Sequence, residues 1–460
     1  MSAYVTSNPA TGRTEKEFPE LDDAGVTQVL SRSHDAYAGW RGTPVEERAQ
    51  ILTRVADAYE SRRDELATLI ATEMGKPMKE AAGEVKLAGA IYRWYAEHGP
   101  DLLKQEVLDP QGAQESLVET EAIGSLIGVM PWNFPYYQVA RFVAPNLMVG
   151  NTIILKHAPI CAASSEVMAE ILHAAGVPDD AYINVFATNE QIADMIADPR
   201  VQGISLTGSE RAGSSVAETA GRNLKKAVLE LGGSDAMIVL DDGDIERTAT
   251  VAARARLMNA GQACNSPKRM IVPNGEVDDY VSVLVRTFES ARVGDPTDPD
   301  TQLGPLSSVG ARDGVVRQVE RAVEQGATLH TGGDAIDGDS AFMRPAVLTG
   351  VTKDMDAYSE EIFGPVAVVY GVDSVDDAVT LANDVSFGLS GSVWGSDLDR
   401  AQEIADRLEV GMAYVNEHGT TLPGLPFGGV KRSGFGRELG RWGMGEFVNT
   451  RLRRTAKAKG

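Results

Sequence analysis

Ser125-Leu126-Ile127-Gly128-Val129-Met130, followed further on by Thr152-Ile153-Ile154-Leu155, is the stretch of sequence that decides the fold. Two more short β-rich runs lie at Tyr182–Phe186 and Val201–Leu206, and a helical pattern near Ser164–Ala175 separates them from the first two. Short β-rich runs that alternate with helical stretches are typical of a parallel sheet with helices on its faces. This part of the chain therefore predicts an α/β unit.

A second series of the same kind follows, and the first hundred residues have a different pattern. The later strands are expected at Met237–Leu240, Met270–Val272, Val366–Tyr370 and Met412–Val415, with helices such as Val277–Ala291 and Ser374–Asn383 between them. Near the start, apolar residues recur at helical spacing from Pro44 to Glu73 and again from Lys79 to Leu103. The fold class expected is α/β, with two doubly wound parallel-sheet domains in succession.

Composition sets limits on size and partners. A chain of 460 residues with 43% apolar residues is long enough for two or three globular units. Its formal net charge of −23 repels polyphosphates and anionic lipids, so we expect neither nucleic-acid nor membrane binding. Nowhere do eighteen apolar residues come together, and Met1-Ser2-Ala3-Tyr4 does not begin like a secretory leader.

Cysteine and histidine usage points to a reducing compartment and away from metals. Cys161 and Cys264 are the two cysteines, too few for a disulfide framework, so we expect a cytoplasmic protein without disulfides. The six histidines lack metal-ligand spacing, so no metal site is expected. Gly434-Phe435-Gly436 begins like a dinucleotide fingerprint but lacks the third glycine and is followed by too short a chain.

Three segments carry residues that could perform chemistry. Cys264 follows closely on Gly261, where a tight turn could present a thiol to a cleft; the alternative is a small buried core residue. Glu230 precedes two glycines and lies between apolar stretches. If it is desolvated, its carboxylate could act as a general base; the alternative is a surface glutamate at a turn. Asn133 lies between aromatics, where its amide could stabilise an oxyanion or belong to a rigid turn.

These segments resemble motifs of the aldehyde dehydrogenases, in family order and over essentially the entire chain. The matching motifs are Pro131–Pro135, Leu206-Thr207-Gly208-Ser209, Glu230-Leu231-Gly232-Gly233, Gly261-Gln262-Ala263-Cys264, Glu361-Ile362-Phe363-Gly364-Pro365 and Pro426-Phe427-Gly428-Gly429. The resemblance implies a Rossmann-like cofactor domain (1–105 and 123–229), a catalytic domain (230–422) and a small oligomerisation segment (106–122 and 440–460). It also implies a homodimer or homotetramer.

The same resemblance implies the catalytic roles. Cys264 attacks the aldehyde carbon, and Asn133 with the Cys264 main-chain N–H holds the oxyanion. Hydride then leaves to a nicotinamide cofactor, and Glu230 activates the water that hydrolyses the thioester. Glu438 resembles a second glutamate that the family can use to relay protons; it could otherwise be an acid at a helix N-terminus. Cys161 is expected to be a core thiol, so no redox switch is predicted.

For the cofactor, the resemblance implies contacts from Lys156, Trp132, Ser209, Glu361 and Phe363. Ser209 would hold the pyrophosphate near a helix N-terminus, where free N–H groups favour anions. Where members that use NAD commonly have a glutamate that binds the ribose 2′-hydroxyl, this chain has Pro159. A 2′-phosphate is then not repelled and could pair with Lys156 and with His157, so NADP is predicted in preference to NAD.

Within the family the chain is most similar to the succinate-semialdehyde dehydrogenases. Arg141, eight residues after Asn133, matches an arginine that meets the substrate carboxylate in that group, and Thr421 lies where a hydroxyl completes the grip. Arg141 could otherwise form an ion pair on a helix surface. Met258 stands where the eukaryotic type has a further arginine, which leaves glutarate semialdehyde or a neutral aldehyde open. Acyl transfer to coenzyme A, a thiol hydrolase and a catalytically silent member are the remaining alternatives.

Overall fold

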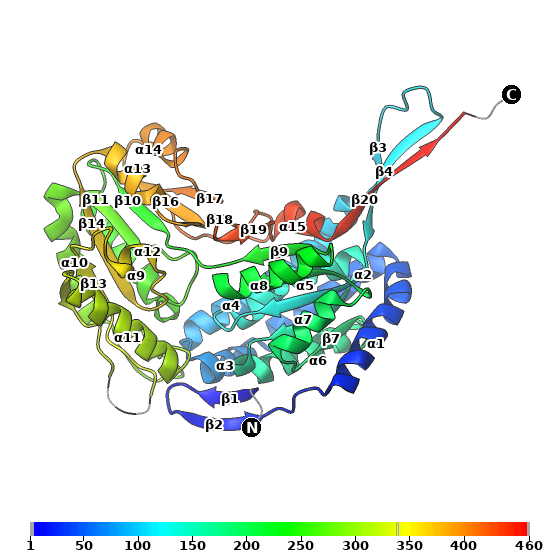
Figure 1. The fold of residues 1–460 in the computed structure, drawn as a ribbon, viewed down its shortest axis with the longest axis horizontal. Helices are drawn as coiled ribbons and strands as arrows, with labels where there is room; N and C mark the ends of the chain where they lie inside the picture. Colours follow the sequence, from blue (N-terminus) through cyan, green and yellow to red (C-terminus); the bar gives the residue numbers. More distant parts are fainter. Residues whose placement is uncertain (1–3, 337, 339, 458–460) are drawn as a thin grey trace.

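The computed structural model describes residues 4–336, 338 and 340–457, which form two lobes and a projecting arm (Figure 1). Each lobe is built around one sheet, so the two α/β units expected from the sequence are both present. Residues 1–3 of the predicted cofactor domain, 337 and 339 of the predicted catalytic domain, and 458–460 of the predicted oligomerisation segment lie outside the described part.

The first lobe contains a six-stranded sheet in which five strands are parallel. In spatial order its strands are β19 (Gly434–Phe435), β9 (Lys226–Glu230), β8 (Val201–Thr207), β5 (Ser125–Met130), β6 (Thr152–His157) and β7 (Tyr182–Asn184). Four of the parallel strands are those expected from the apolar runs. The fifth, β9, was not predicted, because it begins with the exposed Lys226 and buries only its last three residues. The glycine-rich Gly434–Phe435 is an antiparallel edge strand, not a phosphate loop.

Among the described residues, eight helices pack on this sheet or on one another beside it, and four of them come from the helical first hundred residues. They are α1 (Asp23–Gly42), α2 (Val45–Ser61), α3 (Arg63–Met74), α4 (Met78–Leu102), α5 (Pro135–Val149), α6 (Ala162–Ala175), α7 (Asn189–Ala197) and α8 (Glu210–Arg222). The pattern from Pro44 to Glu73 divides into α2 and α3 at Arg62, where φ −100° and ψ 16° leave the helical region. All fifteen residues of α5 are buried, so this helix holds the residues after Asn133 rigidly.

The second lobe contains a seven-stranded sheet, parallel except for its edge strand β12. Its strands are β12 (Thr328–Thr331), β13 (Ala346–Thr349), β14 (Val366–Val372), β11 (Arg269–Pro273), β10 (Ala236–Val239), β16 (Ser390–Trp394) and β17 (Met412–Val415). Its helices are α9 (Ile245–Leu257), α10 (Val277–Ser290), α11 (Val309–Glu324), α12 (Asp356–Ser359), α13 (Val375–Asn383) and α14 (Leu398–Ala405). Strand β16 was not predicted, since Ser390-Gly391-Ser392 conceals a fully buried strand.

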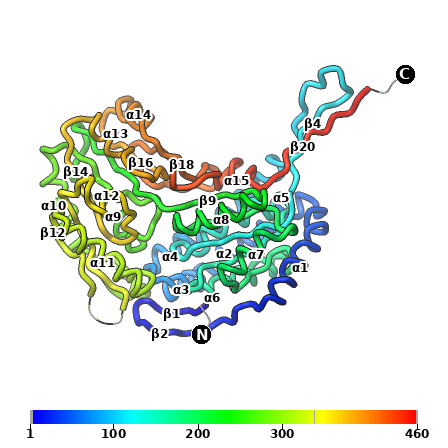
Figure 2. Tube along the Cα trace, viewed as in Figure 1, coloured from blue at the N-terminus to red at the C-terminus, as the bar shows by residue number. Residues whose placement is uncertain are grey.

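The projecting arm brings together two segments that are far apart in the sequence. Strand β4 (Glu115–Ala122) pairs with β3 (Glu106–Val107) on one side and with β20 (Val448–Thr455) on the other, as the tube shows (Figure 2). Helix α15 (Gly440–Glu446) leads into β20. Two further antiparallel pairs are the hairpin of β1 (Val5–Asn8) with β2 (Arg13–Glu17), and β15 (Phe387–Gly388) with the distant β18 (Val430–Lys431). The short 3-10 turns are η1 (Pro159–Cys161), η2 (Met258–Gly261) and η3 (Asn274–Glu276).

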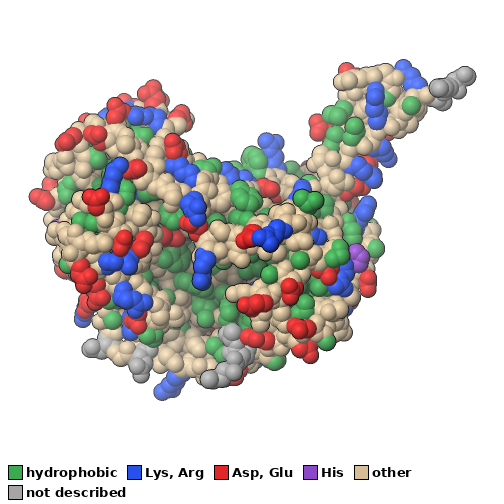
Figure 3. Space-filling view, in the orientation of Figure 1, with side chains coloured by type: hydrophobic (Ala, Val, Ile, Leu, Met, Phe, Trp, Pro, Cys, Tyr) green, Lys and Arg blue, Asp and Glu red, His purple; other side chains and the backbone are tan. Residues whose placement is uncertain are grey.

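One face of the molecule has a hollow between the lobes (Figure 3). Charged side chains of both signs are spread over the visible face, and hydrophobic side chains gather in the hollow (Figure 3). In the described parts of the chain, no helix has both the length and the apolar content to cross a bilayer.

Candidate active site

Two cavities meet at Cys264. The first has a volume of about 270 Å³ and is lined by Pro131, Trp132, Asn133, Gln138, Thr207, Gly208, Ser209, Glu230, Leu231, Gly232, Cys264, Glu361 and Phe363. The second, of about 340 Å³, is lined by Lys76, Glu80, Gly83, Glu84, Leu87, Phe134, Tyr137, Gln138, Met258, Cys264, Asn265, Gly419, Thr421 and Phe427. Cys264 and Gln138 line both. The three proposed catalytic residues, which are far apart in the sequence, therefore share the first cavity.

A tight left-handed turn presents Cys264 to these cavities. Asn259, Ala260 and Gly261 follow one another at φ 51°, 50° and 71°, a region that disfavours residues with a Cβ. A Cβ on Gly261 would lie 2.1 Å from the carbonyl oxygen of Gly364, so only glycine fits there. The tight turn expected from the sequence is thus present, and it includes two non-glycine residues whose conformation the surrounding structure must support.

Cys264 is a free thiol in a protected environment. Burial raises its pKa to about 11, while the positive charges of Arg141 and Lys268 oppose that shift. The Lys268 ammonium donates to the main-chain oxygens of Cys264 (2.7 Å) and Ala263 (3.1 Å). Sequence reasoning missed Lys268, although two cations directly before the apolar run at Met270 could have marked it.

Asn133 is held from both sides. Its side-chain Nδ2 donates to the Gln262 carbonyl at 3.0 Å, which uses one of its two hydrogens. The main-chain carbonyl oxygen of Asn133 accepts from Lys76 Nζ (2.9 Å) and from Asn259 Nδ2 (2.8 Å). One amide hydrogen thus remains to meet an oxyanion in the first cavity.

The start of α5 is fixed by a buried ion pair that sequence reasoning also missed. Lys76 pairs with Glu84, and Glu84 Oε1 accepts from the main-chain N–H groups of Tyr136 (2.9 Å) and Tyr137 (3.3 Å). Its carboxylate therefore takes the place of a side-chain cap, which α5 lacks. The signal was available, since Glu80 and Glu84 are spaced four residues apart on one face of a helix that otherwise buries apolar residues.

Glu230 ends β9 inside the protein. Its carboxyl group is buried, and neither oxygen has a hydrogen-bond partner among the described residues. Burial first, and then the nearby Glu438 carboxyl group, raise the pKa of Glu230 well above its ordinary value, as expected for a desolvated base. Gly428 allows this close packing, because a Cβ there would lie 2.6 Å from Glu230 Oε1.

Arg141 and Glu438 form a buried ion pair, with Arg141 Nε 2.6 Å from Glu438 Oε2. Arg141 also donates to the Tyr137 hydroxyl (3.0 Å) and to Gln138 Oε1, and its guanidinium lies over the rings of Tyr137 and Phe427. It lines neither cavity itself, whereas Thr421 lines the second one. The pairing considered from the sequence is thus in the core, not on a helix surface, and Glu438 pairs with Arg141 instead of capping a helix.

Of the predicted cofactor residues, Trp132, Ser209, Glu361 and Phe363 line the first cavity. Ser209 caps the N-terminus of α8, accepting from Ala212 N at 3.3 Å. Glu361 Oε1 accepts from Gly233 N (3.2 Å) and lies 3.2 Å from Lys268 Nζ. The cavity also contains Thr207, whose buried Oγ1 has no hydrogen-bond partner among the described residues. A free hydroxyl, a helix N-terminus and a carboxylate suit a dinucleotide that carries phosphate and ribose hydroxyl groups.

Lys156 and Pro159 are not among the residues that line the first cavity. Lys156 lies near the carboxyl end of β6, where burial lowers its pKa, and its Nζ is 5.7 Å from the centre of the Tyr4 ring. Pro159 begins η1.

The expectation that His157 could pair with a phosphate is wrong. Its Nε2 lies 3.0 Å from the Pro135 carbonyl oxygen, and its Nδ1 accepts from Ala158 N at 2.7 Å. Burial lowers the pKa of this histidine to about 4, so its ring is neutral at physiological pH.

The comparison with known proteins identifies the family. Residues 2–452 match the sequence profile described as the aldehyde dehydrogenase family. The chain belongs to the aldehyde dehydrogenase family. The prediction of a nicotinamide-dependent aldehyde dehydrogenase is thereby confirmed, as is its two-sheet α/β fold.

Similar aldehyde dehydrogenases have names that specify a substrate and a cofactor. A protein of Deinococcus radiodurans named succinate-semialdehyde dehydrogenase [NADP(+)] is 51% identical over 457 residues, which cover 99% of this chain and 95% of that protein. One of Mycobacterium avium with the same name is 40% identical over 97% of this chain and 95% of its own length. The crystal structure of a Streptococcus pyogenes succinic semialdehyde dehydrogenase in complex with NADP+ superposes with a TM-score of 0.96 at 42% identity, covering 99% of this chain and 100% of that one.

Proposed function

We propose that this aldehyde dehydrogenase oxidises succinate semialdehyde to succinate with NADP+ as the hydride acceptor. The observation that carries the proposal is the position of Cys264, which lines both cavities. One cavity offers groups suited to a dinucleotide, and the other is lined by aromatic and hydroxyl side chains suited to a short polar aldehyde. A nucleophile at their junction can hold the substrate carbon next to a hydride acceptor.

The catalytic residues act in two stages. Cys264 Sγ gives its proton to water in the cavity and bonds to the aldehyde carbon. The resulting thiohemiacetal oxyanion is held by the free Asn133 amide hydrogen and by the Cys264 N–H. The bound nicotinamide supplies the chemistry of accepting a hydride. Cys264 is then left as a thioester, and Glu230 takes a proton from the attacking water, which releases the carboxylic acid and the thiolate.

Carboxylate selection is proposed to come from Arg141 and Thr421. Arg141 donates to Tyr137 and Gln138, which occupies their acceptor oxygens and leaves their O–H and N–H donors for the second cavity. Thr421 adds a further hydroxyl to that cavity. The buried guanidinium of Arg141 thus orients Tyr137 and Gln138, which would bind the substrate carboxylate, and its positive charge favours an anionic substrate.

The preference for NADP+ is supported by Pro159 and by the relatives. At Pro159 there is no carboxylate to bond a 2′-hydroxyl or to repel a 2′-phosphate, and Lys156 provides a nearby cation. The names of the similar enzymes specify NADP(+), and one of them was crystallised in complex with NADP+.

A second candidate is a dehydrogenase of neutral aldehydes such as butanal. One observation favours it: each cation beside the second cavity already has an acidic partner, Arg141 with Glu438 and Lys76 with Glu84. With the charges compensated in this way, a terminal carboxylate gains less from the field of the protein.

The deciding experiment is a panel of three aldehydes, namely succinate semialdehyde, glutarate semialdehyde and butanal, each with NADP+ and with NAD+. We expect kcat/KM to be highest for succinate semialdehyde with NADP+. A higher value for butanal would support the second candidate, and a higher value with NAD+ would contradict the cofactor assignment. Free coenzyme A should not be consumed, since Glu230 favours water as the acyl acceptor.

We also propose a cytoplasmic homodimer or homotetramer. The arm supports an oligomer because the outer edge of β20, which carries the exposed Leu452, is unpaired among the described residues and suits pairing with a second copy. Two free cysteines fit a reducing compartment. Light scattering during gel filtration would measure the oligomer size, and a single-subunit mass would contradict the proposal.

A further inference from the structure

Lys268 contacts both the main chain of Cys264 and the carboxylate of Glu361, two residues that line the first cavity. Its ammonium has three hydrogens and three acceptors nearby: the carbonyls of Ala263 and Cys264, at 3.1 and 2.7 Å, and Glu361 Oε1, at 3.2 Å. The side chain is only 4% exposed, so water does not compete for these contacts. A fully satisfied buried ammonium holds its partners in one geometry.

The chain around this contact is packed too tightly to adjust. A Cβ on Gly232 would lie 2.3 Å from Glu361 Oε2, and one on Gly233 would lie 2.9 Å from the Cys264 carbonyl oxygen. Two adjacent glycines therefore let Glu361 and the nucleophile approach the same stretch of backbone. Gly233 N also donates to Glu361 Oε1, the oxygen that faces Lys268.

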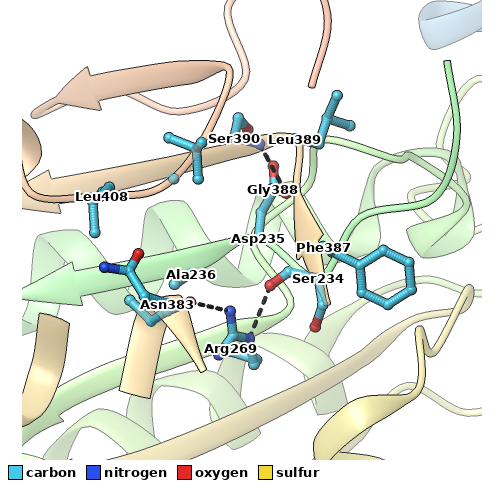
Figure 4. Close-up of a pocket in the computed structure, with 13 residues that line it drawn as sticks. Ser234, Asp235, Ala236, Arg269, Asn383, Phe387, Gly388, Leu389, Ser390 and Leu408 are labelled. Carbon is cyan, nitrogen blue, oxygen red and sulfur yellow. Dashed lines mark hydrogen bonds between the residues drawn. The ribbon is translucent and has the colours of Figure 1, made fainter. Parts of the chain in front are cut away.

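The other charged groups near Lys268 have partners of their own. The Asp235 carboxylate accepts from the hydroxyl and main-chain N–H of Ser390, and Arg269 donates to the carbonyls of Ser234 and Ala382, in the small pocket beside β16 (Figure 4). Asp235 and Arg269 are thus fixed to the sheet of the second lobe. Glu361 differs from them, because it lines the first cavity and its side chain is 19% exposed.

We propose that Lys268 is a positioning residue that couples ligand binding by the Glu361 carboxylate to the position and reactivity of Cys264. When a ligand with vicinal hydroxyls engages Glu361, the carboxylate shares its oxygens between the ligand and Lys268. The hydrogen bond from Lys268 to the Cys264 carbonyl then changes, and so does the electrostatic potential that Lys268 produces at the thiol. The ligand identity, a nicotinamide dinucleotide, rests on the proposed function, whereas the coupling between the three side chains does not.

The test is a double-mutant cycle on the protein without cofactor or substrate. The rate of Cys264 alkylation by iodoacetamide is measured at pH 8 for the parent, Lys268→Met, Glu361→Gln and the double variant. The groups that face the thiol are Arg141 on α5, Lys268 before β11, Glu361, Asp235 and the phenols Tyr137 and Tyr414. The cycle changes only two of them.

We expect Lys268→Met to slow alkylation about tenfold, because the loss of one opposing charge raises the thiol pKa and lowers the fraction of thiolate. Glu361→Gln should change the alkylation rate of the parent by less than about threefold, because Lys268 neutralises the Glu361 carboxylate. In the Lys268→Met background that carboxylate is not neutralised, so its removal by Glu361→Gln should accelerate alkylation about tenfold. Equal factors in the two backgrounds would overturn the proposal. If Lys268→Met does not fold, as judged by circular dichroism, Lys268→Gln replaces it in the cycle.

A second measurement adds NADP+ to the parent and to Lys268→Met. The parent alkylation rate should change several-fold on NADP+ binding, and the change should be lost in the variant although NADP+ still quenches its tryptophan fluorescence. The same change in both proteins would show that NADP+ merely shields the thiol, and would overturn the coupling. No response in the parent would count against the cofactor assignment, while the cofactor-free cycle would still decide the coupling. Lys353→Met, at a surface pair with Asp384, is the control and should match the parent.

Discussion

Arg141 Nε lies 2.6 Å from Glu438 Oε2, and this buried ion pair joins the helix after Asn133 to the segment before α15. It stands behind the wall of the second cavity and beside Glu230, whose pKa depends on both charges. Removing one partner of such a pair leaves an uncompensated charge in the core. The pair therefore links substrate selection, the general base and stability.

Replacement of Arg141 tests substrate selection. In Arg141→Met, Tyr137 and Gln138 lose the donors that orient them, so KM for succinate semialdehyde should rise about tenfold or more, the value of a hydrogen bond to a charged group. KM for butanal should change less than about threefold. Steady-state kinetics with both aldehydes give the comparison, and Arg286→Met, at an exposed pair with Glu246, is the matched control. Equal losses on both aldehydes would show that Arg141 is purely structural.

Replacement of Glu230 separates the two halves of the reaction. Glu230→Gln keeps the shape of the cavity but cannot take a proton from water, so hydrolysis of the thioester should slow by about 10²–10⁴-fold. Formation of the reduced cofactor in the first turnover should remain fast. Stopped-flow absorbance should then show a burst of one equivalent per active site followed by slow turnover. Loss of the burst itself would mean that Glu230 is needed to activate Cys264.

Introducing a carboxylate at Pro159 tests the cofactor assignment. Pro159→Glu should repel a 2′-phosphate and offer an acceptor to a 2′-hydroxyl, so the ratio of kcat/KM for NADP+ to that for NAD+ should fall at least about tenfold. Pro159→Gln is the uncharged control and should change the ratio less. An unchanged ratio in Pro159→Glu would place the 2′-position away from η1.

The pH dependence of thiol alkylation follows from burial. Since burial raises the Cys264 pKa to about 11, only about one thiol in a thousand is ionised at pH 8. The raised value means that reactivity is low in acid and is gained as pH rises, so the iodoacetamide rate should increase about tenfold per pH unit from 7 to 10. Cys161→Ser should give the same profile, because the Cys161 thiol is buried and its pKa is also raised. A plateau below pH 9 would contradict this picture.

Glycine at position 261 should be essential to folding of the nucleophile turn. Gly261→Ala adds a Cβ 2.1 Å from the Gly364 carbonyl oxygen at φ +71°, which should lower the free energy of unfolding by at least about 2 kcal/mol. Gly221→Ala is the control, since its Cβ meets nothing within 4 Å in α8 and should stabilise the helix slightly. Urea unfolding followed by circular dichroism measures both. Equal stabilities would mean that the turn relaxes without cost.

Much of the fold could be predicted because parallel strands buried on both faces appear as continuous apolar runs. Strands β5 and β6 have this pattern, whereas β9 and β16 do not, since Lys226 and Ser390-Gly391-Ser392 interrupt it. Family motifs identified Cys264, Glu230 and Asn133 as candidates. These motifs do not include Lys268 or the Lys76–Glu84 pair, whose roles follow from the groups that they contact in the structure.

The sequence by itself determined the α/β class, the family and the identity of the nucleophile, because these depend on local periodicity and on residues that occur in fixed short motifs. Only the tertiary structure decided that Arg141 stands behind the substrate cavity, that His157 is neutral and that Lys268 holds the Cys264 carbonyl. The physical reason is that charge, burial and hydrogen bonding in the core depend on partners brought together from distant parts of the chain.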